Sequence, residues 1–364
     1  MRPATRPAST TRARIALACG GTAGDVLPAI TVADGLPASL DPVLVGDATD
    51  LARRLAGESG HRLLATPAAP FARTTWRGKA RSIGVTVAGA IAARRLLRRE
   101  GVRLVVGFGG YASVPVGMAA WSLGIPLVLF EANAVPGTAN RVLDRFADRV
   151  LVGTEAAATA FRTRTVLTGI PLRRDVLRVA ARGPHAPLRV LVSGGSFGSP
   201  FLDVQVPALL ARVVAAGHPI EVRHLGHSEP ARAAYAAVGI QASVAPYVSD
   251  MAAEYARADV AIVAAGATTL AELAAVGLPA IVVPLAAAAR DHQTRNAHAF
   301  AAATGMPWCR EGEWDVDRLA AHVITLATSP SAWEAAAAGI RRLARPDATD
   351  AVIRACLDAL EAAG

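Results

Sequence analysis

Residues 20–25 read GGTAGD, and this short stretch decides how the N-terminal part of the chain folds. It follows the apolar residues 15–19 and precedes the helix-like segment VLPAITVADGL, residues 26–36. A strand that breaks into glycines and then opens a helix presents backbone N–H groups to an anion. Glycine permits a close approach because it lacks a Cβ atom. The pattern predicts a phosphate-binding turn, although it also fits a turn that is only tightly packed. Asp25 ends the turn, where its carboxylate could take a proton from a bound hydroxyl group.

The same plan returns in the second half of the chain. Residues 188–193, LRVLVS, lead into GGSFGS, residues 194–199, and then into a helix-like segment up to residue 217. Ligands of open α/β sheets bind beyond the carboxyl ends of the strands. Two such domains whose carboxyl edges face one another would therefore leave a binding cleft between them.

Apolar runs typical of strands alternate with helical patterns along the chain, which predicts doubly wound parallel sheets. The runs are apolar throughout, as expected of strands that are covered on both faces. The predicted strands are residues 14–19, 42–45, 62–65, 103–107, 126–129, 149–152, 165–168, 188–193, 220–224, 242–245, 260–263 and 280–283.

A length of 364 residues favours two domains. We expect a disordered tail at 1–13, a first domain at 14–168, a linker at 169–187 and a second domain at 188–364. The last helix could return to the first domain. The linker is rich in Pro, Gly and Arg, and the tail is basic and rich in Pro, Ser and Thr. No apolar segment of signal-peptide length follows the tail before the first glycine turn.

Charge is concentrated in the first half. Residues 1–155 carry a balance of +8 out of a net charge of +9. A basic half indicates an anionic partner, such as a membrane surface, a nucleic acid or a phosphorylated substrate. No apolar run reaches the roughly 20 residues that span a bilayer. The three cysteines lie far apart, which fits a reducing compartment and shows no metal-ligand spacing.

The basic residues flank one apolar segment, SIGVTVAGAIAA, Ser82 to Ala93. Such a segment between arginines is typical of a helix that lies on an anionic membrane. A buried helix with a solvated basic end is the alternative. Aromatic residues do not alternate with these basic residues in the way that base stacking requires, so a nucleic acid is not expected. The flanking residues are Arg73, Arg77, Lys79, Arg81, Arg94, Arg95, Arg98, Arg99 and Arg103.

Two polar motifs follow predicted strands of the first domain. GFGGYASVP, residues 107–115, could add N–H groups for a second phosphate, with Tyr111 and Ser113 as polar contacts. EANAVPGTAN, residues 131–140, supplies Glu131, Asn133 and Asn140. The alternative for this second motif is a loop made of turn-forming residues.

Two more motifs follow strands of the second domain. In AGATTLAELAAVGLP, residues 265–279, Gly266 permits a turn, Thr268 or Thr269 could cap a helix, and Glu272 could hold the hydroxyls of a ribose. A capping-box role is the alternative for Glu272. RDHQTRNAHAF, residues 290–300, suits sugar hydroxyls, although it also fits a solvated helix start. Its polar side chains are those of Asp291, His292, Gln293 and Asn296.

These features together predict a sugar-nucleotide site. The GxGxxG fingerprint of dinucleotide-binding proteins, with an acidic residue about 20 positions later, is missing. A dinucleotide is therefore not expected.

The whole chain resembles the MurG family, which transfers N-acetylglucosamine to the undecaprenyl-diphosphate-linked muramoyl peptide of peptidoglycan. The resemblance implies two Rossmann-like domains in the GT-B arrangement. It also implies an inverting, metal-independent and cofactor-free transfer from UDP-N-acetylglucosamine, by a peripheral protein on the cytoplasmic face of the bacterial cell membrane. The matching pieces, in family order, are GGTAGDVLPAI, GGYASVP, EANAVPGTAN, TGIPLRRDV, GGSFGS, YVSDMAAEYARADVAIVAAGATTLAELAAVGLP and DHQTRNA.

The resemblance also assigns residues to the two substrates, with the first domain on the acceptor and membrane side and the second on the donor side. Asp25 takes the place of the catalytic base. The residues expected on the acceptor or its diphosphate are Gly20, Gly21, Thr22, Gly24, Gly109, Gly110, Tyr111, Glu131 and Asn133. The residues expected on the donor are Arg173, Ser196, Thr268, Glu272, His292 and Gln293.

Several positions depart from the family pattern. Asp25 replaces a His, although related antibiotic and sterol glycosyltransferases carry Asp at the end of a similar GTRGD turn. Phe130 and Ala132 replace the His and Gln of a His-Glu-Gln-Asn loop, and Ile170 replaces an Asn. Ala264 and Ala265 replace Arg and Ser.

These departures keep three alternatives open. The first is a diverged transferase for a specialised metabolite or another lipid acceptor. The second is a silent sugar-nucleotide-binding or membrane-binding partner of cell-wall enzymes. The third is a UDP-N-acetylglucosamine 2-epimerase, which the acceptor-side loops and the basic apolar segment disfavour.

Overall fold

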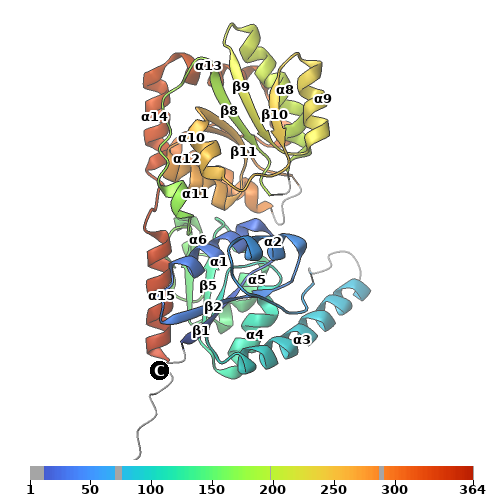
Figure 1. The fold of residues 1–364 in the computed structure, drawn as a ribbon, viewed down its shortest axis with the longest axis vertical. Helices are drawn as coiled ribbons and strands as arrows, with labels where there is room; N and C mark the ends of the chain where they lie inside the picture. Colours follow the sequence, from blue (N-terminus) through green and yellow to red (C-terminus); the bar gives the residue numbers. More distant parts are fainter. Residues whose placement is uncertain (1–11, 70–75, 197, 287–290, 364) are drawn as a thin grey trace, which may run out of the picture.

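Two parallel β-sheets, one in each half of the chain, form the frame of the molecule (Figure 1). The computed structural model describes residues 12–69, 76–196, 198–286 and 291–363. Within them the first sheet has the order β3-β2-β1-β4-β5-β6-β7 and the second the order β10-β9-β8-β11-β12. Every ladder between neighbouring strands is parallel. The predicted α/β class with two doubly wound sheets is confirmed.

The strands agree closely with the sequence prediction because most of them are short runs of buried apolar side chains. The edge strands of the two sheets are shorter or more exposed. The first sheet contains β1 (Ala13–Ala18), β2 (Leu40–Gly46), β3 (Leu63–Ala65), β4 (Val102–Gly107), β5 (Leu127–Glu131), β6 (Arg149–Val152) and β7 (Thr165–Leu167). The second contains β8 (Leu188–Ser193), β9 (Ile220–Leu225), β10 (Ala242–Ala245), β11 (Val260–Ala264) and β12 (Ala280–Val283).

Helices connect the strands and cover both sheets (Figure 1). The first half contains α1 (Ala23–Gly35), α2 (Asp50–Glu58), α3 (Trp76–Arg99), α4 (Ser113–Leu123), α5 (Thr138–Leu143) and α6 (Glu155–Ala158). The second half contains α7 (Arg174–Leu177), α8 (Pro200–Ala215), α9 (Ser228–Ala237), α10 (Met251–Arg257), α11 (Ala267–Val276), α12 (His292–Thr304), α13 (Val316–Thr328), α14 (Pro330–Arg341) and α15 (Ala348–Ala362). Short 3₁₀ helices lie at Asp144–Phe146 and Glu311–Glu313.

The last helix returns to the first half of the chain. Figure 1 shows α14 beside the second sheet and α15 beside the first. Val352 and Cys356 of α15 are buried in the same core as Ile15 and Leu17 of β1. The chain therefore passes between the halves at residues 168–187 and again at residues 342–347. The two passages touch, because a Cβ atom on Gly169 would lie 2.5 Å from the Cβ atom of Arg345.

Two further expectations concern the first half. Most of the predicted disordered tail, residues 1–13, lies outside the described residues, and Ala13 already begins β1. The apolar segment of residues 82–93 lies inside α3. In the part of the chain that the structure describes, no helix has both the length and the apolar character to cross a membrane. The domain boundaries at residues 168 and 187 stay a prediction.

Candidate active site

The carboxyl ends of four strands in the first sheet bring the predicted acceptor-side residues together. The first glycine turn follows β1, Asp47 follows β2, the Gly109–Gly110 turn follows β4, and Glu131 ends β5. In parallel sheets, loops at this edge are where ligands bind. A methyl group on Gly110 would lie 2.3 Å from the carbonyl oxygen of Gly20, so the two glycine turns touch.

Asp25 lies in the first helical turn of α1, and its carboxyl group is next to the Gly109–Gly110 turn. The hydroxyl of Thr22 donates a hydrogen bond of 3.0 Å to its carboxyl group. Cβ atoms on Gly109 and Gly110 would lie 3.2 and 3.1 Å from the two carboxyl oxygens. Both glycines have positive φ angles, of 91° and 71°, which side-chain-bearing residues rarely adopt. Glycines at these positions therefore give the Asp25 carboxyl group its room.

The surroundings of Asp25 favour its neutral form. The pKa of Asp25 is raised to about 8, mainly by burial; hydrogen bonds from Thr22 oppose the shift, and the carboxylates of Glu131 and Asp47 add to it. The residue itself is half-buried, so it keeps access to a substrate. A carboxyl group with such a pKa can exchange a proton near neutral pH, as a general base must.

Glu131 organises its own loop. Its carboxylate accepts hydrogen bonds from the backbone of Asn133 (3.0 Å) and Gly137 (2.8 Å), and from the side chains of Asn133 (2.9 Å) and Asn140 (3.0 Å). A carboxylate offers about four lone-pair sites, and these bonds fill them. The geometry therefore gives Glu131 the task of shaping the loop, and a direct contact with the acceptor stays a prediction.

Asn133 and its neighbour link this loop to the second half of the chain. The side chain of Asn296, on α12, accepts a hydrogen bond of 2.8 Å from the backbone N–H of Ala134. It donates bonds of 3.1 Å to the Asn133 side chain and to the carbonyl of Ala265. Asn296 is only 4% exposed. The acceptor loop, β11 and α12 are thus fastened at one buried point.

On the donor side, Glu272 is anchored to α10. The hydroxyl of Tyr255 donates a hydrogen bond of 2.8 Å to its carboxyl group, and burial raises the pKa of Glu272. The capping-box alternative is wrong, because α11 begins at Ala267 and its N-cap is Gly266, six residues before Glu272. Arg173 lies close enough to lower the pKa of Glu272, and it donates a hydrogen bond of 2.9 Å to the carbonyl of Ser249.

Two buried polar atoms near Glu272 have no hydrogen-bond partner among the described residues. They are the hydroxyl oxygen of Thr268 and the Nε atom of Arg173. Neither Thr268 nor Thr269 caps α11 with its side chain, contrary to the sequence expectation. Buried polar groups are normally satisfied, so these two atoms mark a place where a polar ligand would fit.

The remaining donor-side residues lie in loops and helix starts. His292 and Gln293 begin α12, and the Gln293 side chain accepts a hydrogen bond of 2.9 Å from the backbone N–H of Leu285. Ser196 is exposed in the second glycine turn. Ser199 caps α8 by accepting a hydrogen bond of 3.2 Å from the N–H of Leu202. The start of α8 therefore has the form of an anion-binding helix N-terminus.

Four of the positions that depart from the family pattern are buried, whereas Asp25 and Ala132 are half-buried. Phe130 packs on Phe108 with ring centroids 5.5 Å apart. Ile170 is 5% exposed, and a Cβ atom on Gly153 would lie 2.5 Å from it. Ala264 and Ala265 are buried at the end of β11. At these four positions, apolar packing has taken the place of polar side chains.

Sequence reasoning missed four residues around the site: Asp47, Asn296 in its bridging role, Tyr255, and Asp203. Asp203 on α8 accepts hydrogen bonds from His224 (2.9 Å) and His227 (2.7 Å). A methyl group on Gly198 would lie 2.7 Å from the His227 ring, so this cluster supports the second glycine turn. The signal that could have found Asp47 is its place directly after a predicted strand.

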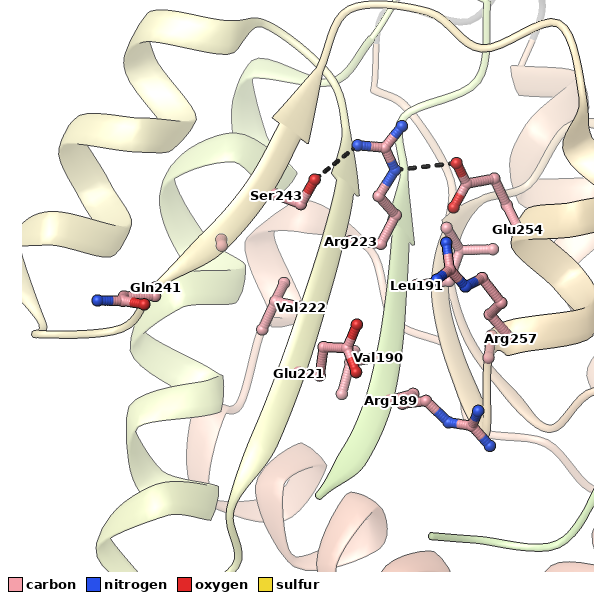
Figure 2. A pocket seen from close by; sticks show the side chains of 12 residues that line it. Arg189, Val190, Leu191, Glu221, Val222, Arg223, Gln241, Ser243, Glu254 and Arg257 are labelled. Carbon is pink, nitrogen blue, oxygen red and sulfur yellow. Dashed lines mark hydrogen bonds and ion pairs between the residues drawn. The ribbon is translucent and has the colours of Figure 1, made fainter. Parts of the chain in front are cut away.

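A hollow of about 560 Å³ lies away from these residues, on the face of the second sheet. Figure 2 shows Arg223 on β9 bonded to Ser243 and Glu254 within it. Arg189 and Glu221 line its other end, near the starts of β8 and β9. None of the predicted site residues lines this hollow, so it is separate from the candidate active site. Among the described residues, no group of three or more His, Cys, Asp or Glu could hold a metal ion.

Each half of the chain matches a known domain family. Residues 15–152 match the glycosyltransferase family 28 N-terminal domain, and residues 189–351 match the glycosyltransferase family 28 C-terminal domain. The chain is 39% identical to the UDP-N-acetylglucosamine--N-acetylmuramyl-(pentapeptide) pyrophosphoryl-undecaprenol N-acetylglucosamine transferase of Alkalilimnicola ehrlichii, over 94% of this chain and 98% of that one. It is 39% identical to the protein of the same name from Sorangium cellulosum, over 96% and 88% of the two chains.

Solved structures show the same fold. The crystal structure of Acinetobacter baumannii MurG superposes with a TM-score of 0.75 at 28% identity, over 95% of this chain and 99% of that one. The glycotransferase of kitacinnamycin superposes with a TM-score of 0.68 at 18% identity, over 97% and 99% of the two chains. The second likeness shows the fold alone. The predicted GT-B arrangement is confirmed.

Proposed function

The chain belongs to glycosyltransferase family 28, and from this premise we propose that it transfers N-acetylglucosamine from UDP-N-acetylglucosamine to a lipid-diphosphate-linked muramoyl peptide. This is the lipid I to lipid II step of peptidoglycan synthesis. The observation that carries the proposal is the match to transferases of this name along nearly the full length of both chains. The chain is therefore an N-acetylglucosamine transferase of the MurG kind.

In the proposed reaction, the acceptor hydroxyl attacks the anomeric carbon, and the bond from that carbon to the UDP oxygen breaks. Asp25 takes the hydroxyl proton, and the new glycosidic bond has inverted configuration. Negative charge accumulates on the departing diphosphate. The N-terminus of α8, together with the guanidinium of Arg173, stabilises that charge.

The donor contacts follow from the groups that the fold leaves available. Tyr255 fixes one side of the Glu272 carboxyl group, and we assign the other side to the ribose hydroxyls. The carbonyl oxygen of Gln293 holds the loop after β12, which leaves its NH₂ group for the sugar. The unpartnered hydroxyl of Thr268 adds a contact at the start of α11, and Ser196 contacts the diphosphate from the second glycine turn. His292, at the start of α12, is assigned to the donor by the family resemblance alone.

The acceptor contacts follow in the same way. We assign the acceptor diphosphate to the N–H groups of the two glycine turns, with Tyr111 and Asn133 at their edges. The residues in this role are Gly20, Gly21, Thr22, Gly24, Gly109 and Gly110. Glu131 acts through the shape of its loop.

We propose that α3 carries the surface with which the protein binds a membrane. Ile83, Val87 and Ile91 are 51, 49 and 50% exposed and recur every four residues, so they form one apolar strip along the helix. Trp121 on the neighbouring α4 is 58% exposed. The exposed strip argues against the buried-helix alternative for these positions. The exposed arginines at residues 95, 98 and 99 would contact anionic lipid on the cytoplasmic face of the cell membrane.

One observation favours a second candidate function. Three carboxyl groups, those of Asp25, Asp47 and Glu131, surround the turn at which an acceptor diphosphate would bind. Like charges disfavour one another at close range. A diverged acceptor, either another lipid or a specialised metabolite, would suit this surrounding better than the standard one.

Turnover of labelled UDP-N-acetylglucosamine tests these possibilities. With lipid I in detergent micelles, the proposed enzyme forms lipid II and releases UDP. Turnover only with another acceptor would support the diverged transferase, and UDP-N-acetylglucosamine binding without turnover would support a silent paralogue. Conversion of the sugar nucleotide without any acceptor would identify an epimerase and overturn the proposal.

A further inference from the structure

Asp47 is a buried carboxyl group that the proposed reaction does not yet use. It follows β2 and is 8% exposed. One of its oxygens accepts a hydrogen bond from the hydroxyl of Tyr111. The other oxygen is buried and has no hydrogen-bond partner among the described residues. A buried carboxyl oxygen without a hydrogen-bond partner lowers the stability of the fold.

The position of Asp47 is tied to the first glycine turn. A Cβ atom on Gly20 would lie 1.9 Å from the unpartnered oxygen, so Asp47 occupies the space that a side chain at residue 20 would need. The Tyr111 ring lies 3.4 Å from where the Cβ atom of residue 21 would be. The hydrogen bond from Tyr111 to Asp47 therefore holds the ring beside the Gly20–Gly21 backbone.

Asp47 also acts on Asp25 through charge. Burial is the largest cause of the raised pKa of Asp25; the carboxylates of Glu131 and Asp47 also raise it, and the Thr22 hydroxyl lowers it. The buried thiol of Cys19 is affected in the same direction, because burial and the charges of Asp25 and Asp47 raise its pKa. The groups that shift the pKa of Asp25 include no cation among the described residues.

We propose that Asp47 is a positioning residue, which holds Tyr111 against the first glycine turn and places a second negative charge behind Asp25. The proposal rests on the proposed function, in which Asp25 is the base. It gives a reason why a carboxylate can stand where the resembled family has a histidine. An isolated aspartate has a pKa near 4, too low for an efficient base at neutral pH, whereas a histidine has a pKa near 6.5. Burial is the main cause of the raised pKa of Asp25, and the charge of Asp47 adds to it, so the carboxyl group exchanges its proton near neutral pH.

The experiment measures Asp25 itself and the reaction in parallel. The side-chain carboxyl carbons of aspartate are labelled with ¹³C, and Asp25, assigned by its loss in Asp25→Asn, is titrated in the wild type and in Asp47→Asn. Asparagine keeps the size and the acceptor for Tyr111 but removes the charge. We expect the pKa of Asp25 to fall by about one unit, because the variant lacks the nearby negative charge that raises it. The acid limb of kcat/KM should move to lower pH by the same amount.

A matched control is available on the same helix. Asp34→Asn removes an exposed carboxylate at the other end of α1, which is paired with His61, and it should leave the pKa of Asp25 unchanged. Tyr111→Phe tests the second part of the proposal. It should raise KM for the acceptor several-fold while UDP affinity stays as in the wild type. If Asp47→Asn does not fold, Asp47→Ser removes the same charge from a smaller side chain.

The possible results separate the proposed role of Asp47 from the assignment of Asp25 as the catalytic base. An unchanged Asp25 pKa in the folded Asp47 variant would overturn the inference about charge. Wild-type acceptor KM in Tyr111→Phe would overturn the inference about position. If the pKa of Asp25 falls but the pH profile does not move, the inference stands and the assignment of Asp25 as the base fails.

Discussion

Asp25 is held by Thr22 at the edge of two glycine turns, with a pKa raised to about 8 by burial and by neighbouring carboxylates. We expect Asp25→Asn to reduce turnover about 10²–10⁴-fold, the usual contribution of a positioned general base. Since a base acts in its ionised form, the wild-type rate should rise with pH and level off above about 8. Steady-state rates between pH 6 and about 9.5, with isothermal titration of UDP as the control for donor binding, test this.

Asp25→His is the companion variant. If lipid I is the acceptor, a histidine should support at least comparable turnover, because its unperturbed pKa near 6.5 suits the same task. Poor turnover of lipid I by the Asp25→His variant would indicate that the acceptor has diverged. An Asp25→Asn enzyme with the wild-type rate would mean that Asp25 is only a turn residue.

Glu272 gives a separate prediction for the donor. We expect Glu272→Ala to weaken UDP binding by about 1–3 kcal/mol, the cost of losing hydrogen bonds to a charged partner. Calorimetry measures this directly. Tyr255→Phe is the matched control, since it removes the bond that orients Glu272 but leaves the carboxyl group in place, and a smaller loss should follow. Unchanged UDP affinity in a folded Glu272→Ala protein would exclude the assignment.

For individual residues, the sequence predicts only part of the candidate site. Gly20 and Glu131 could be found because each follows an apolar run, and Asp25 because it ends the glycine turn that begins at Gly20. The Tyr111–Asp47 hydrogen bond joins residues 64 positions apart, and the Ala134–Asn296 bond joins residues 162 positions apart. Such contacts depend on how the elements pack, so no local pattern predicts them. The polar-to-apolar changes at Phe130 and Ile170 were visible, but their burial in the core was not.

Elements were more predictable than side-chain contacts. The strands were found because parallel strands covered on both faces must be apolar along their whole length. The helix α3 was found only in its middle, residues 82–93, whereas the structure extends it over Trp76–Arg99. Arginine and leucine have high helix propensity, so the basic flanks continue the helix. The apolar length alone could not indicate this.

The exposed strip on α3 makes a prediction about membranes. We expect the protein to bind anionic vesicles, and binding should weaken as salt rises, because the screening length falls from about 10 Å at 0.1 M to about 3 Å at 1 M. Replacing Ile83, Val87 and Ile91 with Ser should abolish binding in a vesicle co-sedimentation assay. A matched control is Val204→Ser with Val214→Ser, which removes exposed apolar side chains from α8. Equal binding by both variants would assign the membrane contact elsewhere.

At the scale of the whole molecule, hydrogen bonds between the two halves position the acceptor loop. Asn296 joins α12 to the acceptor loop through Asn133 and Ala134. We expect Asn296→Ala to raise KM for the acceptor more than it weakens UDP binding. In a double-mutant cycle with Asn133→Ala, the two residues should show a coupling of about 0.5–3 kcal/mol in kcat/KM, as for residues in one hydrogen-bond network. Strict additivity would show that the loop is positioned independently of the second half.

The contact of Gly169 with Arg345 has a mechanical consequence. Both passages of the chain between the halves lie at this contact, and Gly169 has a φ angle of 81°, a conformation that glycine adopts without strain. Two covalent links that lie at one place form a hinge between the halves. Small backbone rotations at this hinge would let one half swing relative to the other, provided that the hydrogen bonds from Asn296 to Asn133 and Ala134 break. The gap between the halves would then be widest at the edge farthest from the hinge. A long chain-like substrate would enter there sideways instead of being threaded end-first.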